Sequence, residues 1–310
     1  MPELEASKSE EDSCLNCGHA LLHDHSFCSL CGQKRQPLKR TIRTILEDAW
    51  ESTVAIDSKL VRTISNLLIR PGKLTKEYLE GRRVSYLKPA SLFLLSAALL
   101  FLSIEWTSLT QQSTDVTEIT SKYVSLSILP GFSFSVTGEQ YEQIRTAEDD
   151  ELSGILFGEK IQENSFEQKI VVKAMKLIRE DGVLALRQKV SDVASKTVFL
   201  LVPIMALLIM GLHIRRKLYF ADAIIFCLHF HSAAFLMYLL LVATPSERLR
   251  GFLAFALVLF FFWYTACSLK TAFGNSWIAA TMKTGLLLLT HGLIVVVLTT
   301  GLIISVLLTN

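Results

Sequence analysis

The chain has 310 residues, 51% of them hydrophobic, with a mean hydropathy of +0.40 and a formal net charge of +2. The apolar residues form long blocks rather than an alternating pattern, which excludes an ordinary water-soluble domain and predicts membrane spans. The small net charge identifies no partner, because membrane topology depends on how Lys and Arg are distributed beside each span.

The first twelve residues are acidic and polar, so we predict a disordered lead over residues 1–12 and no signal peptide. Two CxxCG motifs follow, with ten residues between them. This spacing allows two tight turns to bring four thiolates to one tetrahedral ion, for which zinc is the expected metal. The segment 13–35 is therefore predicted to be a zinc ribbon that depends on its structural Zn²⁺ to fold. The ligands are Cys14, Cys17, Cys28 and Cys31.

Gly18 and Gly32 each follow a motif, where a positive φ lets backbone N–H groups point at the sulfurs. A redox dithiol pair or two disulfides are alternatives, but a cytosolic location and the absence of a βαβ pattern disfavour them. The intervening loop carries His19, His23 and His25, which are either solvated or substitute for a cysteine ligand.

Residues 36–86 are predicted to form cytoplasmic or interfacial amphipathic helices. A helix over 38–50 carries cations off its apolar stripe, so it either lies on anionic lipid or packs against the next helix. That next helix spans 58–69 and is stopped by Pro71 and Gly72. Thr75 is then expected to cap a short helix that ends at Gly81.

Three cations follow that short helix, and they are expected at the membrane interface, in contact with lipid. They are Arg82, Arg83 and Lys88.

The combination of this ribbon with a downstream array of Arg-Pro-Gly, Tyr, Gly-x-Arg, Tyr and Pro resembles a bacterial family of zinc-ribbon membrane proteins classed as a domain of unknown function. The resemblance covers residues 14–105 and implies a bacterial inner-membrane protein with a cytoplasmic ribbon and no established activity. The matching positions are Cys14, Cys17, Gly18, Phe27, Cys28, Cys31, Gly32, Gln33, Lys34, Arg70, Pro71, Gly72, Tyr78, Gly81, Arg83, Tyr86 and Pro89.

Five apolar runs are long enough to cross a hydrocarbon core of about 30 Å. The expected fold is therefore mainly α, a polytopic helical membrane protein with about five spans. A first span occupies 87–105, and a four-span bundle occupies 197–310. The runs lie near 87–104, 197–214, 220–243, 251–269 and 284–308.

The distribution of Lys and Arg predicts a cytoplasmic N-terminus. The segment up to Lys88 holds 14 of these cations, whereas the 106–196 loop holds 10 beside 14 acidic residues. Five crossings would leave the C-terminus outside and make 106–196 an extracytoplasmic loop domain. In that loop we predict a hairpin over 124–136 and helices over 165–179 and 183–196. The acidic run 148–151 is either a solvated turn or a divalent-cation site.

Ionisable residues inside spans are candidates for function. Cys227 and His231 share a helix face at i, i+4, whereas His229 points elsewhere. His229 and His231 are expected roughly 15 Å below the cytoplasmic edge and His291 about 10 Å below it, so helix tilt could bring them together. These four residues form a candidate intramembrane polar cluster. Hydrogen bonding to neighbouring polar groups is the alternative to a copper or haem site.

Three functions follow from these features. A non-enzymatic membrane protein whose ribbon docks a protein partner or regulates is favoured, and nucleic acid is disfavoured because the ribbon lacks interleaved aromatic and basic residues. A transporter or channel for a small solute or ion is the alternative. An enzyme has little support: no catalytic motif is present, and pairs such as Glu139 and Glu142 are common on surface helices. The sequence is compatible with an oligomer.

Overall fold

The computed structural model describes residues 13–21, 26–35, 58–115, 123–129, 132–137, 197–244 and 246–309, with a few single positions between 139 and 176. The chain divides into two units, Met1–Ser103 with Val202–His291, and Ile104–Leu201 with Gly292–Asn310. Several predictions lie outside the described residues. They are the lead 1–12, the helix over 38–50, the acidic run 148–151 and the helices over 165–179 and 183–196.

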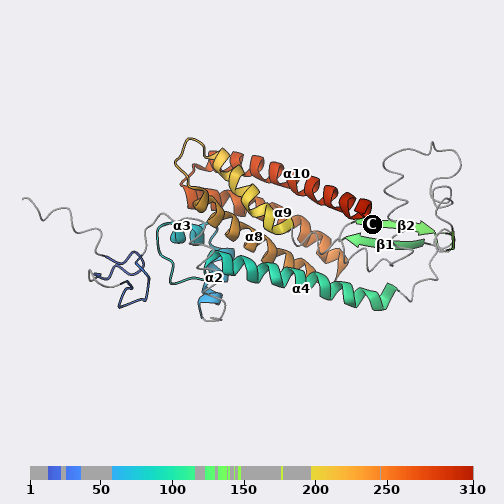
Figure 1. The fold of residues 1–310 in the computed structure, drawn as a ribbon, viewed down its shortest axis with the longest axis horizontal. Coiled ribbons are helices and arrows are strands. Elements are labelled where there is room, and N and C mark those ends of the chain that lie inside the picture. The colour runs from blue at the N-terminus through green and yellow to red at the C-terminus, as the bar shows by residue number, and fades with distance from the viewer. Residues whose placement is uncertain are drawn as a thin grey trace, which may run out of the picture. The chain divides into compact units, whose positions relative to one another are not determined.

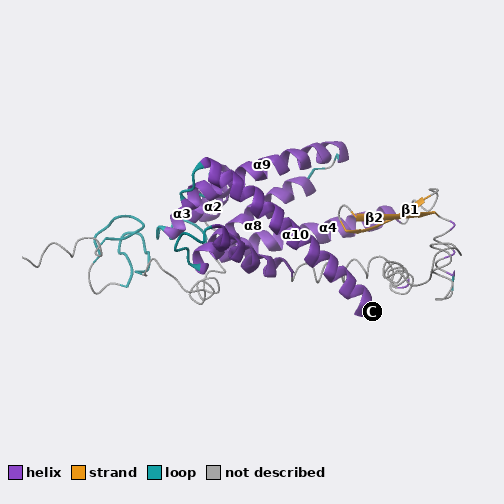
Figure 2. Ribbon diagram, turned by 90° about the horizontal axis from the view of Figure 1, so that it is seen from above, coloured by secondary structure: helices purple, strands orange, loops and turns teal. Residues whose placement is uncertain are grey.

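The predicted mainly helical class is confirmed, and within the described residues four helices are long and apolar enough to cross a membrane. The second predicted run, 197–214, corresponds to the helix Thr197–Leu212, which is apolar but shorter than the other four. Figure 1 shows α2 and α3 at one end of the long helices α8 and α9, and Figure 2 shows how much of the described chain is helix. The bounds are α2 Ser58–Ile69, α3 Lys73–Leu79, α4 Pro89–Asp115, α8 Phe220–Val242, α9 Glu247–Phe273 and α10 Trp277–Thr309.

Helix α8 is the most buried of the four candidate spans. In its most apolar stretch, 56% of the residues are buried, against 6% for α10. The main core cluster draws on α2, α3, α4, α8 and α9, so the two short helices pack onto the long ones through apolar contacts. Full burial of such a side chain, compared with its exposure to water, contributes about 1.5–3 kcal/mol to stability. The cluster consists of Leu67, Leu74, Leu92, Ala233, Met237 and Tyr264.

Two long-range hydrogen bonds fix α2 against its neighbours. The buried hydroxyl of Tyr264 in α9 donates to the carbonyl oxygen of Leu67 at 2.7 Å, which satisfies a carbonyl in the last turn of α2. Thr63 accepts a hydrogen bond from the N–H of Leu87 at 2.9 Å, just before α4 begins at Pro89. The predicted helix over 58–69 is therefore confirmed, with its polar Thr63 used to position the next helix.

The turn between α2 and α3 brings the backbone of α3 against α9. Gly72 has a φ of 76°, and a Cβ at this position would lie 2.6 Å from the carbonyl oxygen of Ser268. The prediction that Thr75 caps α3 is wrong, because Gly72 is the N-cap and Thr75 lies inside the helix. The hydroxyl of Thr75 instead contacts His229 in α8, a tertiary contact that the local sequence does not reveal.

The turn between α9 and α10 is fixed by residues that follow the helix Thr197–Leu212. Helix α9 ends at Gly274 with a φ of 61°, and the Arg216 guanidinium donates to the carbonyl oxygens of Phe273 and Gly274. Asn275 donates from Nδ2 to His213 Nε2 at 3.0 Å and accepts at Oδ1 from Lys283. Side chains thus donate hydrogen bonds to the carbonyl groups at the end of α9.

In the other unit, β1 (Tyr123–Leu129) and β2 (Phe132–Thr137) pair antiparallel, with Val124 opposite Val136 and an irregularity between Ser127 and Leu129. The predicted hairpin over 124–136 is confirmed.

Candidate metal centre and buried polar groups

The two cysteine motifs have the same backbone structure. In the first, the N–H of Cys14 donates to the carbonyl oxygen of His19 at 2.8 Å, and the N–H of Gly18 donates to that of Cys14 at 2.8 Å. In the second, Cys28 and Gly32 make the equivalent bonds at 2.8 and 2.9 Å. Gly18 and Gly32 have φ values of 73° and 71°, which confirms the predicted positive φ.

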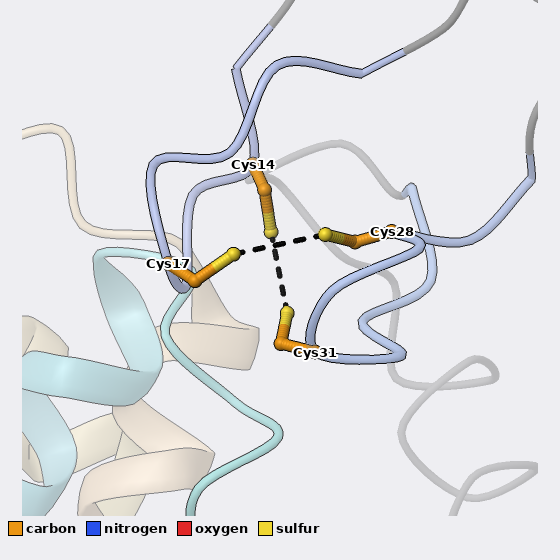
Figure 3. Close-up of side chains that lie close together, drawn as sticks. All are labelled: Cys14, Cys17, Cys28 and Cys31. Atoms are coloured by element: carbon orange, nitrogen blue, oxygen red, sulfur yellow. Dashed lines mark hydrogen bonds between the residues drawn. The ribbon is translucent and has the colours of Figure 1, made fainter.

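The four cysteine sulfurs point toward a common centre between the two turns (Figure 3). The Sγ atoms of Cys14 and Cys31 lie 3.6 Å apart, as do those of Cys17 and Cys28, and all four lie within 4.8 Å of one another. A tetrahedral ion with metal–sulfur bonds of about 2.3 Å places its ligands about 3.8 Å apart. A disulfide would need about 2.05 Å. The four thiols therefore fit a single metal ion, and all four cysteines are free.

The thiols differ in acidity before any metal binds. A hydrogen bond from the backbone of Cys31 is the main cause that lowers the pKa of Cys28, to about 6. At Cys17 a hydrogen bond from the backbone of His19 lowers the pKa, but desolvation and the neighbouring thiols outweigh it and raise the pKa to about 12. Burial raises the pKa of Cys14. Because thiolates held side by side repel one another, binding of a metal ion at this site is coupled to proton release.

Of the three loop histidines, only His19 lies in the described residues, and it is exposed and outside the four-sulfur group. His23 and His25, in the loop between the two motifs, lie outside the described residues.

Gln33, directly after the second motif, joins the ribbon to the connection between α3 and α4. Its Nε2 donates to the carbonyl oxygen of Gly81 at 2.8 Å, and its Oε1 accepts from the N–H of Arg83 at 3.2 Å. The carbonyl oxygen of Gln33 also accepts from Cys28. Sequence reasoning included Gln33 in a motif without assigning it this role, which depends on a segment 48 residues away.

The three cations expected at the lipid edge are not equivalent. Arg82 makes ion pairs with Glu77 and Glu80. Arg83 donates from Nε to the carbonyl oxygen of Tyr78 at 3.2 Å and lies over the Tyr78 ring. Lys88 directly precedes α4, and its side chain is half-buried. Arg82 and Arg83 therefore also hold the α3–α4 connection in place.

The intramembrane cluster divides into two parts. His229 and Thr75 lie 2.9 Å apart at Nδ1 and Oγ1, and both are buried. The Nδ1 of His231 donates to the carbonyl oxygen of Cys227 at 2.8 Å, and its buried Nε2 has no hydrogen-bond partner among the described residues. The ring centroids of His231 and His291 lie 5.4 Å apart, so the structure brings these two together, while His229 points elsewhere as expected.

The chain is thus a mainly helical protein that combines membrane-span-like helices with a four-cysteine cluster able to hold a metal ion. Residues 57–101 match a family model described as "Protein of unknown function (DUF3667)". The match covers α2, α3 and the first part of α4, including the Arg-Pro-Gly turn, whereas the cysteines lie before it. None of the curated proteins and none of the solved structures matches the chain.

Proposed function

We propose that the chain is a bacterial inner-membrane protein whose ribbon binds structural Zn²⁺ and docks a protein partner, or regulates, on the cytoplasmic side without catalysis. The observation that carries the proposal is the four-thiol cluster joined through Gln33 to the turn before α4. A set of four thiolates with tetrahedral spacing suits Zn²⁺, and no ligand position is left open for chemistry at the metal.

A protein partner is favoured by the surface of the ribbon. Three apolar side chains are exposed on this small segment, Leu15, Phe27 and Leu30, and Leu30 is 69% exposed. Exposed apolar residues on so small a segment are available for contact with a partner. Lys34 and Arg35 are the cations in the described part of the ribbon, too few for a phosphate-tracking surface.

The docking role is tested by site-specific photo-crosslinking in native membranes, with the crosslinker at Leu30. We expect a discrete adduct that disappears in the Cys14→Ser form. With the crosslinker placed at Phe27 instead, Leu30→Ser is expected to weaken the adduct. Ser29→Ala, at an exposed position beside Leu30, is the matched control and should leave the adduct unchanged. A labelling pattern that survives Cys14→Ser would contradict a role for the folded ribbon.

The orientation is tested separately with the Ser29→Cys variant in membrane vesicles of known sidedness. A membrane-impermeant thiol reagent is expected to reach this exposed position in inverted vesicles only. Labelling in right-side-out vesicles would place the ribbon outside and overturn the assignment that rests on the Lys and Arg distribution.

Transport of a small solute or ion is a second candidate, favoured by polar atoms inside the spans. Among the described residues, several buried side-chain atoms in candidate spans lack a hydrogen-bond partner. Such groups line solute or ion pathways in membrane proteins. Flux into liposomes that contain the purified protein tests this function, with His231→Phe as the variant expected to change it. The atoms are His229 Nε2, His231 Nε2, Ser268 Oγ, Thr284 Oγ1 and His291 Nδ1.

A further inference from the structure

A groove of about 490 Å³ lies where α3 meets α9 and the start of α10. Its lining is strongly basic, with five cations and a single carboxylate, Glu77. Four of the cations lie within residues 70–82, and the fifth lies far along the chain in α9, so the sequence does not show that they share one groove. They are Arg70, Lys73, Lys76, Arg82 and Lys270.

The charges of this groove are only partly compensated. Glu77 forms an ion pair with Arg82. At the surface, Lys76 Nζ lies 3.9 Å from Glu80 Oε1. Across the described part of the chain, no carboxylate lies within ion-pair distance of Arg70, Lys73 or Lys270. Cations that line one concave surface repel one another, and an anion bound among them removes that repulsion.

Two half-exposed tryptophans line the groove. Trp263 and Trp277 both line it and are 49% and 51% exposed, and Lys270 Nζ lies 4.5 Å from the centre of the Trp277 ring. Half-exposed Trp beside Lys is typical of the interface between hydrocarbon and headgroups.

One face of α9 runs from the groove into the apolar part of the span. Phe252, Phe255, Leu259 and Trp263 recur at steps of three and four residues and are all exposed. Residues at these steps share one helix face. Lys270, two turns beyond Trp263, belongs to the same face and lies in the groove. The helix thus presents a long apolar strip that ends at the basic groove.

We propose that this groove binds the phosphate of an anionic phospholipid headgroup, with an acyl chain along the exposed face of α9. Lys73 and Lys270 contact the phosphate, and Trp263 lies at the level of the glycerol. Free phosphate shares the headgroup chemistry, but it would leave the apolar strip without a role. Basic pockets beside spans on the cytoplasmic side are a recurring form of headgroup site. This inference does not depend on the metal or on the partner of the ribbon.

The test uses the full chain purified in detergent and titrated with phosphatidylglycerol, with phosphatidylcholine of the same acyl chains as the zwitterionic probe. Bound lipid is counted by native mass spectrometry. We expect tighter binding of phosphatidylglycerol, with a loss of about fivefold for Lys73→Gln or Lys270→Gln and a larger loss for the pair. Lys73→Arg retains the charge and should retain binding.

Arg248→Gln is the matched control, because this exposed cation lies at the opposite end of α9. An equal loss in Arg248→Gln, or unchanged affinity in the double variant, would overturn the proposal. A third arm adds inorganic phosphate at millimolar concentration. If phosphate alone displaces the lipid completely and binds the wild-type chain as tightly, the groove is a free-phosphate site and the lipid assignment fails.

Discussion

The side-chain amide of Gln33 donates a hydrogen bond to the carbonyl oxygen of Gly81 at 2.8 Å, and the same amide accepts one from the N–H of Arg83. The side-chain amide thus satisfies one backbone carbonyl and one backbone N–H of the turn, as a paired strand would do with its own backbone. The metal-binding segment is therefore attached to the connection between α3 and α4 by one donated and one accepted hydrogen bond.

Substitution of Gln33 should loosen this attachment without removing the metal. Gln33→Ala eliminates both hydrogen bonds, each worth about 1 kcal/mol net, whereas Gln33→Glu retains the acceptor and loses the donor. We expect faster amide exchange at Gly81 to Arg83 in Gln33→Ala, an intermediate effect in Gln33→Glu, and unchanged zinc content in both. Exchange that stays at the wild-type rate in Gln33→Ala would show that the contact does not hold the ribbon.

Loss of a metal ligand should unfold the ribbon while the helices remain. Cys14→Ser or Cys28→Ser removes a buried thiolate ligand and is expected to reduce bound zinc from about one ion per chain to near zero. A strong zinc chelator should have the same effect on the wild type and should expose residues 13–35 to proteolysis. Elemental analysis of the purified protein gives the zinc content.

The matched control for these variants is Cys267→Ser, which changes a cysteine of α9 outside the four-sulfur group. It should leave the zinc content unchanged. A Cys14→Ser protein that still carried a full equivalent of zinc would rule out the assigned ligand set.

Substitution of Gly72 should destabilise the packing of α3 on α9. Alanine there suffers both the positive φ of 76° and a Cβ only 2.6 Å from the Ser268 carbonyl oxygen. We expect Gly72→Ala to cost about 3 kcal/mol, visible as a lower thermal midpoint in detergent. Gly285→Ala is the control, because that glycine lies in α10 with open space around it, and its midpoint should not fall. Equal midpoints for the two variants would contradict the close approach.

The buried hydrogen bond between Thr75 and His229 should contribute more to the free energy of unfolding than an exposed threonine hydrogen bond. Thr75→Val keeps the shape of the side chain but leaves the buried Nδ1 of His229 without its partner, at an expected cost of about 1–3 kcal/mol. Thr75→Ser keeps the hydroxyl and should recover most of that loss. Thr281→Val, where an exposed hydroxyl bonds only its own helix, should be close to neutral. The readout is again thermal unfolding in detergent.

Local patterns predicted much of this fold. Helix α2 has the predicted bounds, and its stripe of Ile64, Leu67 and Leu68 packs on the core. Gly18 and Gly32 have the positive φ that ribbon turns require. These features depend on neighbours within a few positions, so composition and spacing were sufficient to predict them.

Contacts between distant segments could not be predicted in the same way. Thr75 was expected to cap a helix, but its hydroxyl meets His229, 154 residues away. The basic groove depends on α3 lying beside α9, and no periodicity in either helix indicates this. The sequence indicated that helix tilt could bring His231 and His291 together, and the packing of α8 and α10 shows that their rings are neighbours.

The contact at Gly72 has a mechanical consequence for the helices it joins. Because backbone meets backbone there, no flexible side chain lies between α3 and α9 to absorb a displacement. A change in the tilt of α9 must therefore carry α3 along with it. The close approach at Gly72 thus couples the position of α3 to the tilt of the candidate span α9.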